Sequence, residues 1–203
     1  MTVYLYKDDL PNDFKISGDL AIDTEAMGLK NRRDRLCLLQ FSNGDGDAHL
    51  VQFSNYNYEA PNLKKLLSNP DIVKIFHYAR FDVAIIFTYL GVMLDNIYCT
   101  KIASKIARTY TSEHGLKNLC QELLSIQISK QQQSSYWGQE ELTKEQREYA
   151  AGDVLYLHKL RDKLDGILVR EERSELAGLC FDFIATRVLL DIEGWDEEDI
   201  FQH

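Results

Sequence analysis

The amino-acid sequence predicts an α/β fold in which helices flank a mixed central β-sheet. Two observations lead to this prediction. Up to about residue 53, short apolar runs alternate with polar turns, which is typical of an antiparallel meander of strands. From about residue 62, short apolar runs alternate with longer stretches of helical period, which is typical of parallel strands joined by helices. With 203 residues, 45% of them hydrophobic, the chain can enclose one substantial core.

The first part of the chain predicts four strands. Residues 3–6 are typical of a short edge strand, and the apolar runs at 19–25, 36–41 and 48–53 are typical of three consecutive strands. Asn-Gly and Asp-Gly dipeptides between the last two runs are strong hairpin signals. We expect residues 26–35 to form an arginine-rich loop.

The second part of the chain predicts two further strands, at 72–76 and 97–99. Gly91 is expected to end a helix, and Thr143 with Gln146 forms a capping box that begins another. We expect helices at 62–67, 80–90, 100–108, 116–124, 143–164 and 170–190. The acidic tail from 191 to 203 is expected to be frayed.

Composition and charge exclude several functional classes. The formal net charge is −9, whereas proteins that bind nucleic acid through overall charge are basic. Any such binding must therefore depend on metal ions and local basic patches. No apolar run approaches the ~20 residues of a membrane span, and the first residues turn acidic at once, unlike a signal peptide. We expect a cytoplasmic protein with no membrane partner.

The cysteines lack the close spacing of zinc ligands, and each stands among apolar neighbours. We expect buried, reduced thiols and no zinc site. The residues concerned are Cys37, Cys99, Cys120 and Cys180.

Two carboxylates, Asp23 and Glu25, end the apolar run at 20–22. Side chains two positions apart project from the same face of a strand. Like charges held this close repel each other unless a cation lies between them, and hard divalent cations prefer oxygen ligands. The spacing therefore indicates a metal site, although a strand followed by an acidic loop would give the same pattern.

Two further acids have suggestive positions. Asp82 follows the strand at 72–76 in the first turn of a helix, where it would also complement the helix dipole. Asp153 lies one helical turn after Tyr149, so both occupy one face of a late helix. Its neighbours Val154 and Leu155 are apolar, and a buried acid requires a partner. A metal ion is one such partner.

The three patterns, in this order, resemble the motifs of the DEDD 3′–5′ exonucleases. The tyrosine form of that superfamily is indicated because Tyr149 precedes Asp153 by four residues. Within the superfamily the chain is most similar to ribonuclease D, over residues 20 to about 164. The stretches 115–119, 130–137 and 142–157 carry this similarity in addition to the acids.

The resemblance implies a ribonuclease H-like domain that removes nucleoside 5′-monophosphates from RNA 3′ ends by two-metal hydrolysis. Two Mg²⁺ or Mn²⁺ ions would be held by Asp23, Glu25, Asp82 and Asp153. Asp23 would bridge both ions, and Tyr149 would orient the attacking water. The substrates would be single-stranded RNA 3′ ends, such as those of tRNA precursors or of other structured RNA with 3′ overhangs.

The same resemblance implies a set of substrate-binding residues. Leu29 matches the position of an apolar wedge against the terminal base, although packing within the loop explains it equally well. Lys101, Lys105 and Arg108 recur at helical spacing and could follow a nucleic-acid backbone, but a solvated helix face explains them too. The full set of implied contacts is Ala26, Met27, Leu29, His77, Tyr78, Phe81, Lys130 and Trp137.

The chain departs from the family pattern in three places. Tyr78 stands where the family commonly has Asn, and Tyr136 where it commonly has Asp. Longer ribonuclease D enzymes carry helical RNA-binding domains after the nuclease domain, whereas we expect here an exonuclease domain at 1–169 followed only by a helix and tail at 170–203. The substrates would then be short, flexible 3′ ends, or a partner or a dimer would supply the missing RNA-binding surface.

Three alternatives remain at this stage. Single-stranded DNA could be the substrate, since proofreading domains share this chemistry and no residue reveals recognition of the 2′-OH. The chain could instead be an inactive RNA-binding scaffold, although such relatives usually lose a metal ligand. A metal-dependent endonuclease is the third alternative.

Overall fold

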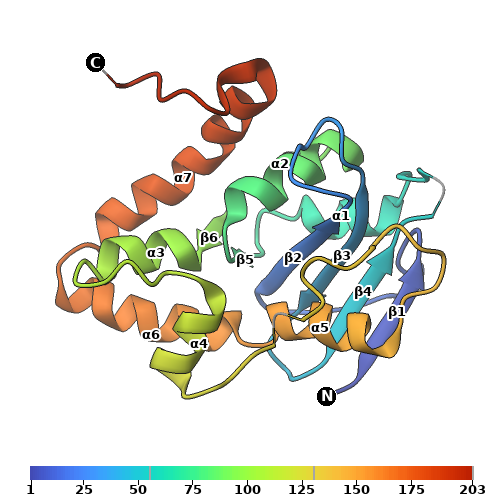
Figure 1. The fold of residues 1–203 in the computed structure, drawn as a ribbon, viewed down its shortest axis with the longest axis horizontal. Coiled ribbons are helices and arrows are strands. Elements are labelled where there is room, and N and C mark those ends of the chain that lie inside the picture. The colour runs from blue at the N-terminus through green and yellow to red at the C-terminus, as the bar shows by residue number, and fades with distance from the viewer. Residues whose placement is uncertain (55, 130, 203) are drawn as a thin grey trace.

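Six strands form one mixed sheet among the residues that the structure describes, which are 1–54, 56–129 and 131–202. The structure is a computed structural model, shown in Figure 1. The strand order is β1-β4-β3-β2-β5-β6. The strands are β1 (Val3–Lys7), β2 (Leu20–Ala26), β3 (Leu36–Ser42), β4 (Ala48–Gln52), β5 (Lys74–Phe76) and β6 (Ile97–Cys99).

The predicted antiparallel meander is confirmed, because β2 pairs antiparallel with β3 and β3 with β4. β1 lies at the edge of the sheet, parallel to β4. On the other side, β5 is parallel to β2 and β6 is parallel to β5. The sheet is therefore mixed and flanked by helices, as the two hydrophobic periods predicted (Figure 1).

Seven α-helices are described, and most begin and end close to their predicted bounds. None of the described helices is long and apolar enough to cross a membrane. The helices are α1 (Pro61–Leu67), α2 (Ala79–Leu90), α3 (Thr100–Ala107), α4 (Leu116–Leu124), α5 (Lys144–Val154), α6 (Leu157–Arg170) and α7 (Ser174–Leu190).

The prediction of one continuous helix over 143–164 is wrong. α5 ends at Val154 and α6 begins at Leu157, and the two residues between them, Leu155 and Tyr156, form a turn instead of continuing the helix. The two halves bury their apolar faces against different partners, since α5 packs on β2, β3 and β4 whereas α6 packs on α3 and α4. A straight helix could not cover both surfaces.

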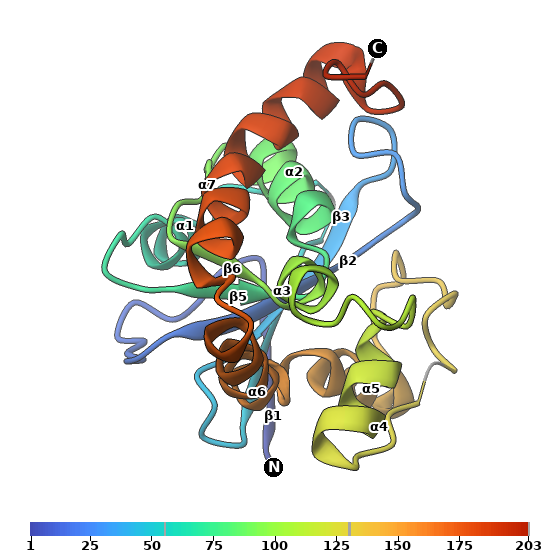
Figure 2. The same cartoon turned by 90° about the vertical axis from the view of Figure 1, so that its left-hand side faces the viewer.

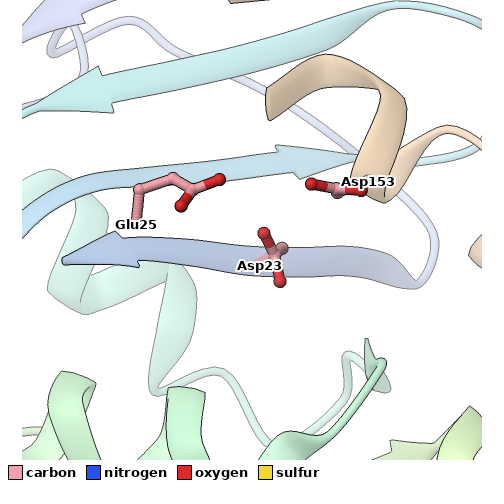
Figure 3. Close-up of side chains that lie close together, drawn as sticks. All are labelled: Asp23, Glu25 and Asp153. Atoms are coloured by element: carbon pink, nitrogen blue, oxygen red, sulfur yellow. The ribbon is translucent and has the colours of Figure 1, made fainter. Parts of the chain in front are cut away.

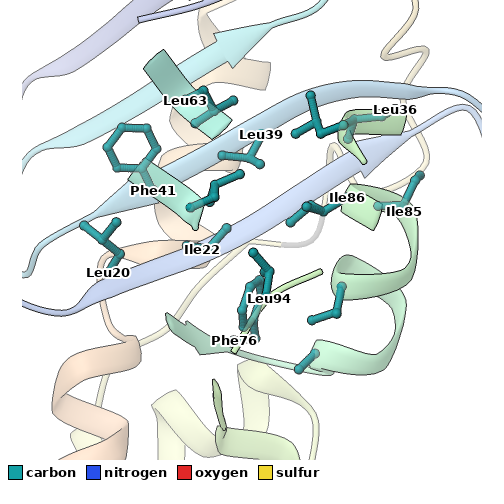
Figure 4. Packing of buried hydrophobic residues seen from close by; sticks show 14 of the residues in the cluster. Leu20, Ile22, Leu36, Leu39, Phe41, Leu63, Phe76, Ile85, Ile86 and Leu94 are labelled. Atoms are coloured by element: carbon teal, nitrogen blue, oxygen red, sulfur yellow. The ribbon is translucent and has the colours of Figure 1, made fainter. Parts of the chain in front are cut away.

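Each face of the sheet carries its own hydrophobic core. Successive residues of β2 alternate between the two cores, because neighbouring side chains on a strand point to opposite faces. Leu20 and Ile22 pack towards α1 and α2 with Leu39 and Phe41 of β3 (Figure 4). Ala21 belongs to the second core, which α5 and α6 cover. The same alternation places Asp23 and Glu25 on the α5 side and Thr24 on the α2 side.

The two strands on either side of β2 cover it unequally. β3 pairs with β2 from Ala21 to Ala26, whereas the described pairing with β5 involves only Leu20 and Ala21. The carboxyl-terminal half of β2 therefore has an edge to which β5 makes no ladder hydrogen bonds. The amino-terminal turn of α2 approaches at this edge, where Thr24 donates a hydrogen bond to Asp82.

The beginning of the acidic tail is anchored, so the prediction of a frayed tail is wrong for this part. Asp191 accepts hydrogen bonds from Arg80 at 2.5 and 2.7 Å and forms an ion pair with Arg187 at 2.8 Å. In the loop after β2, Nζ of Lys30 lies 3.2 Å from Oε1 of Glu197. The tail consequently lies beside that loop, as Figure 2 shows at the far end of α7.

Candidate metal centre

Three carboxylates converge where β2 meets α5. Asp23 and Glu25 project from the same face of β2, and Asp153 reaches them from α5 (Figure 3). One oxygen from each of the three lies within 4.8 Å of the others. The period of the strand explains the first two positions, and the small residues Ala150 and Ala151 explain the third, because they allow α5 to approach the sheet closely.

The electrostatics of the three carboxylates are those of a cation site. Burial raises the pKa of Asp23 well above its usual value, and the nearby charges of Asp82, Asp153 and Glu25 raise it further. Burial and then the charges of Asp153 and Asp82 raise the pKa of Glu25 in the same direction. A divalent cation would relieve this repulsion, and carboxylate oxygens are its preferred ligands. These residues therefore fit a divalent metal ion.

Asp82 is close to these acids but is not one of the three that converge, and it has a partner of its own. Its Oδ1 accepts a hydrogen bond of 2.6 Å from the hydroxyl of Thr24, on the opposite face of β2. Burial raises the pKa of Asp82 to about 7, against the lowering effect of Thr24. The structure thus brings Asp23, Glu25 and Asp153 together but does not include Asp82 in the same tight cluster.

Sequence reasoning missed two residues that contact the acids. Thr24 is one, and Gln40 on β3 is the other, since its Nε2 donates a hydrogen bond of 2.6 Å to Oδ2 of Asp23. Gln40 gave a signal in the sequence, as a polar residue within a largely apolar strand, whereas Thr24 stands between Asp23 and Glu25 and gave none of its own. The partner could not be read from sequence, because it depends on strand register and on the entry of α2.

Tyr149 lies beside the acids on α5. A capping box begins this helix, with the Thr143 hydroxyl accepting from the Gln146 backbone and the Gln146 side chain accepting from the Thr143 backbone. The pKa of the Tyr149 hydroxyl is raised, first by burial and then by the charges of Asp153 and Glu25. The hydroxyl is therefore protonated at neutral pH and acts as a hydrogen-bond donor. Its ring lies 6.0 Å from that of Trp137.

A cleft of about 600 Å³ opens over the carboxylates. Leu29 at its rim is 82% exposed, so it is not held by packing within the loop. Trp137 lines the cleft but is only 2% exposed. Of the predicted substrate contacts, Lys130 lies outside the described residues, and the others all line the cleft: Ala26, Met27, Leu29, His77, Tyr78, Phe81 and Trp137.

Tyr78 has an unusual conformation at the rim of this cleft. Its φ of 75° lies in the left-handed region, which bulky residues rarely occupy. Its side chain is 47% exposed, and the ammonium group of Lys101 lies 4.2 Å from the centre of its ring. A strained and exposed aromatic residue beside a cation is typical of a functional position.

For Arg108, both the suggestion that it follows a nucleic-acid backbone and the alternative of a solvated helix face are wrong. Its side chain is fully buried, and its guanidinium group binds the Ser104 hydroxyl at 2.9 Å, the carbonyl of Glu113 at 3.0 Å and the carboxylate of Glu122. Arg108 thus ties the end of α3 to α4. Lys101 lines the cleft, and Lys105 is exposed.

Comparisons with known proteins point in one direction. A family model described as 3′–5′ exonuclease matches residues 7–169. Ribonuclease D of Zymomonas mobilis is 30% identical over 166 residues, covering 78% of this chain and 42% of that protein. The exosome complex exonuclease RRP6 of Saccharomyces cerevisiae is 28% identical, covering 84% of this chain and 22% of that protein. The chain thus spans about two fifths of the length of the ribonuclease D relatives that it matches.

Solved structures include full-length matches. Brucella melitensis NrnC with bound Mg²⁺ is 50% identical, with a TM-score of 0.95 and complete coverage of both chains. Brucella melitensis NrnC bound to pGG is also 50% identical, with a TM-score of 0.96 and coverage of 100% and 99%. Escherichia coli RNase D, at 22% identity and a TM-score of 0.74, shares the fold over 88% of this chain and 48% of that chain.

Proposed function

The chain belongs to the 3′–5′ exonuclease family as a ribonuclease D-like member of the DEDD superfamily, and from this membership we propose that it shortens single-stranded RNA from the 3′ end. The mixed sheet flanked by helices is the ribonuclease H-like fold of this superfamily, and the family consists of hydrolytic exonucleases. The proposed products are nucleoside 5′-monophosphates. The convergence of Asp23, Glu25 and Asp153 within 4.8 Å at the cleft is the observation that carries the proposal.

Divalent cations, Mg²⁺ or Mn²⁺, are the cofactors of this proposal. Asp23, Glu25 and Asp153 would hold one ion, and Asp82 with Asp23 would hold a second. When bound, the two ions would activate water and stabilise the charge that develops on the phosphate oxygens. The Mg²⁺ in the structure of Brucella melitensis NrnC supports this choice of metal.

Tyr149 is proposed to orient the attacking water. Its hydroxyl remains protonated at neutral pH because burial and the nearby carboxylates raise its pKa. It therefore cannot remove a proton from water, but it can donate a hydrogen bond and fix the direction of attack. Its position, one turn before Asp153 on α5, supports this role.

Leu29 and Tyr78 are proposed to hold the terminal nucleotides. Leu29 is an exposed apolar side chain at the rim of the cleft, where it can pack against a base. Tyr78 offers an exposed ring that a second base can stack on, and Lys101 beside it can contact a phosphate. These three residues recognise features that all nucleotides share, so we expect little sequence preference.

Short RNA is the proposed substrate. The curated relatives are named ribonuclease D, and a full-length structural neighbour is bound to pGG. A cleft of about 600 Å³ has room for only a few nucleotides. Single-stranded 3′ overhangs of longer RNA, such as tRNA precursors, would enter the same cleft by their ends.

The proposal can be tested with RNA and DNA oligomers of identical sequence that carry a label at the 5′ end. With Mg²⁺ or Mn²⁺ we expect a ladder that shortens from the 3′ end of RNA, and no cleavage in EDTA. A 3′-phosphate should block the reaction, whereas an endonuclease would still cut. Equal ladders on RNA and DNA would contradict the RNA preference, and the absence of cleavage with either metal would contradict the enzymatic function.

A further inference from the structure

Gln40 is buried directly opposite Asp23. The two residues are paired across β3 and β2, so their side chains lie on the same face of the sheet. Gln40 is 0% exposed, and its Nε2 lies 2.6 Å from Oδ2 of Asp23. Because both residues belong to paired strands in the centre of the sheet, their backbones are held rigidly with respect to each other.

When Asp23 is charged, as it would be with a bound cation, it favours this orientation of the Gln40 amide. If the amide were turned over, its Oε1 would face the carboxylate, and the two oxygens would repel each other. With the amide as it is, Oε1 is buried and has no hydrogen-bond partner among the described residues. A buried polar atom without a partner is unfavourable. Stability alone would therefore favour an apolar residue at this position, which suggests that the amide serves Asp23.

We propose that Gln40 is a positioning residue that prepares Asp23 to bind the divalent cation. Its amide would fix the plane of the Asp23 carboxylate, while the remaining lone pairs of that carboxylate stay available to the ion shared with Glu25 and Asp153. Without this hydrogen bond, Asp23 could rotate away from the two other acids. The proposal rests on the metal centre of the proposed function, and it adds a residue from a strand that carries none of the four acids.

Gln52 on β4 offers a matched control. It is a second buried glutamine in the same sheet, 3% exposed, and its Nε2 donates to the carbonyl of Gln139 at 2.8 Å. Its hydrogen-bond partners include none of the four acids. Replacing it with Met removes a buried amide from the sheet without touching Asp23.

The test compares the wild type with Gln40→Met and Gln52→Met by calorimetric titration with Mn²⁺, which measures binding in the absence of RNA. We expect Gln40→Met to raise the Kd for Mn²⁺ by about tenfold or more, as is usual when a residue that orients a metal ligand is lost. Gln52→Met should bind Mn²⁺ like the wild type. Thermal unfolding in EDTA serves as the control that both variants are folded.

Two outcomes distinguish this proposal from the metal centre on which it rests. Wild-type binding of Mn²⁺ with an unchanged Kd in folded Gln40→Met would overturn the role of Gln40 alone. A wild type that binds no Mn²⁺ would overturn the metal centre and the positioning residue together. If Gln40→Met does not fold, Gln40→Asn keeps an amide in the strand but shortens its reach, and it should show the same weakened binding.

Discussion

Asp23 and Asp153 approach each other from a strand and a helix, and each raises the free energy of the other's charge. The pKa of Asp23 is raised by burial first and by the neighbouring carboxylates, Asp153 among them, second. Such repulsion destabilises the metal-free protein. A bound cation would remove the repulsion, and this gain in free energy would strengthen the binding of the cation. Residues of this kind are kept for function rather than for stability.

Replacing Asp153 with Asn should separate these two effects. The amide keeps the shape of the side chain but removes one charge, so we expect hydrolysis of RNA to fall by about a hundredfold or more, since metal-based stabilisation is worth several kcal/mol. The thermal unfolding temperature in EDTA should stay equal or rise, because the repulsion is relieved. Asp162→Asn, an exposed change on α6, is the control. Activity close to that of the wild type would remove Asp153 from the centre.

Tyr149→Phe isolates the hydroxyl group from the ring. The ring would still pack against Trp137, so binding of Mn²⁺ should be preserved. The rate at saturating RNA should fall by about 10²-fold, as expected for the loss of a group that orients or activates a reactant. A rate equal to that of the wild type in single-turnover experiments would exclude the hydroxyl from the mechanism.

The sequence predicts some of these residues better than others. Asp23 and Glu25 were found because a period of two places them on one face of a strand. Thr24 and Gln40 were not found, because their hydrogen bonds cross to α2 and between strands. A polar residue in an apolar strand shows that a partner exists, but only the register of the sheet shows which partner it is.

At the scale of secondary structure, α5 is the element that brings proposed catalytic groups to the sheet. It carries both Tyr149 and Asp153, and the capping box at Thr143 fixes where it begins. The capping signature was recognisable in the sequence because both of its residues are local. The break after Val154 was not, since it arises from two packing surfaces that only the folded chain presents.

Thr143→Ala should destabilise the protein through this helix. Losing the side-chain cap costs about 1 kcal/mol, and we expect this decrease in the free energy of unfolding by urea. Because Thr143 lies nearly three helical turns from Asp153, the Kd for Mn²⁺ should change little. A large loss of metal binding with unchanged stability would show that the beginning of α5 acts on the site in another way.

At the scale of the whole molecule, the acids make stability depend on pH. Burial raises the pKa of Asp82 to about 7, and the pKa values of Asp23 and Glu25 are raised as well. A carboxyl group whose pKa is raised by folding contributes most to stability below pH ~4, the pKa of such a group in the unfolded chain, because it is then neutral in both the folded and the unfolded state. This contribution is lost as the pH rises from there through the folded pKa, about 7 for Asp82.

We therefore expect the metal-free protein to lose stability between about pH 5 and pH 8 in EDTA, as measured by urea unfolding. Asp82→Asn should flatten this dependence. Excess Mg²⁺ should reduce the loss, because a cation favours the charged acids. Asp34 does not interfere, since its pKa is lowered to about 2 by Arg33 and the backbone of Lys30, and it titrates below this range. A stability that rises steadily from pH 5 to pH 8 would contradict the electrostatic account.

The net negative charge of the chain is compatible with the proposed action on RNA. The net charge of −9 includes four acids at the proposed metal centre, where bound cations would offset them. The division into a domain at 1–169 and a helix with tail at 170–203 remains a prediction. The observed packing of α7 on α2, α3 and β6 is consistent with attachment to the same domain.

The most direct test of the central claim is a diffraction experiment on crystals grown with Mn²⁺, using the anomalous signal of manganese. The account predicts a strong anomalous peak bounded by the carboxylates of Asp23, Glu25 and Asp153, and no such peak in crystals of Asp153→Asn. Manganese bound only elsewhere, in a protein that degrades RNA with this metal, would show that the three carboxylates are not the catalytic centre.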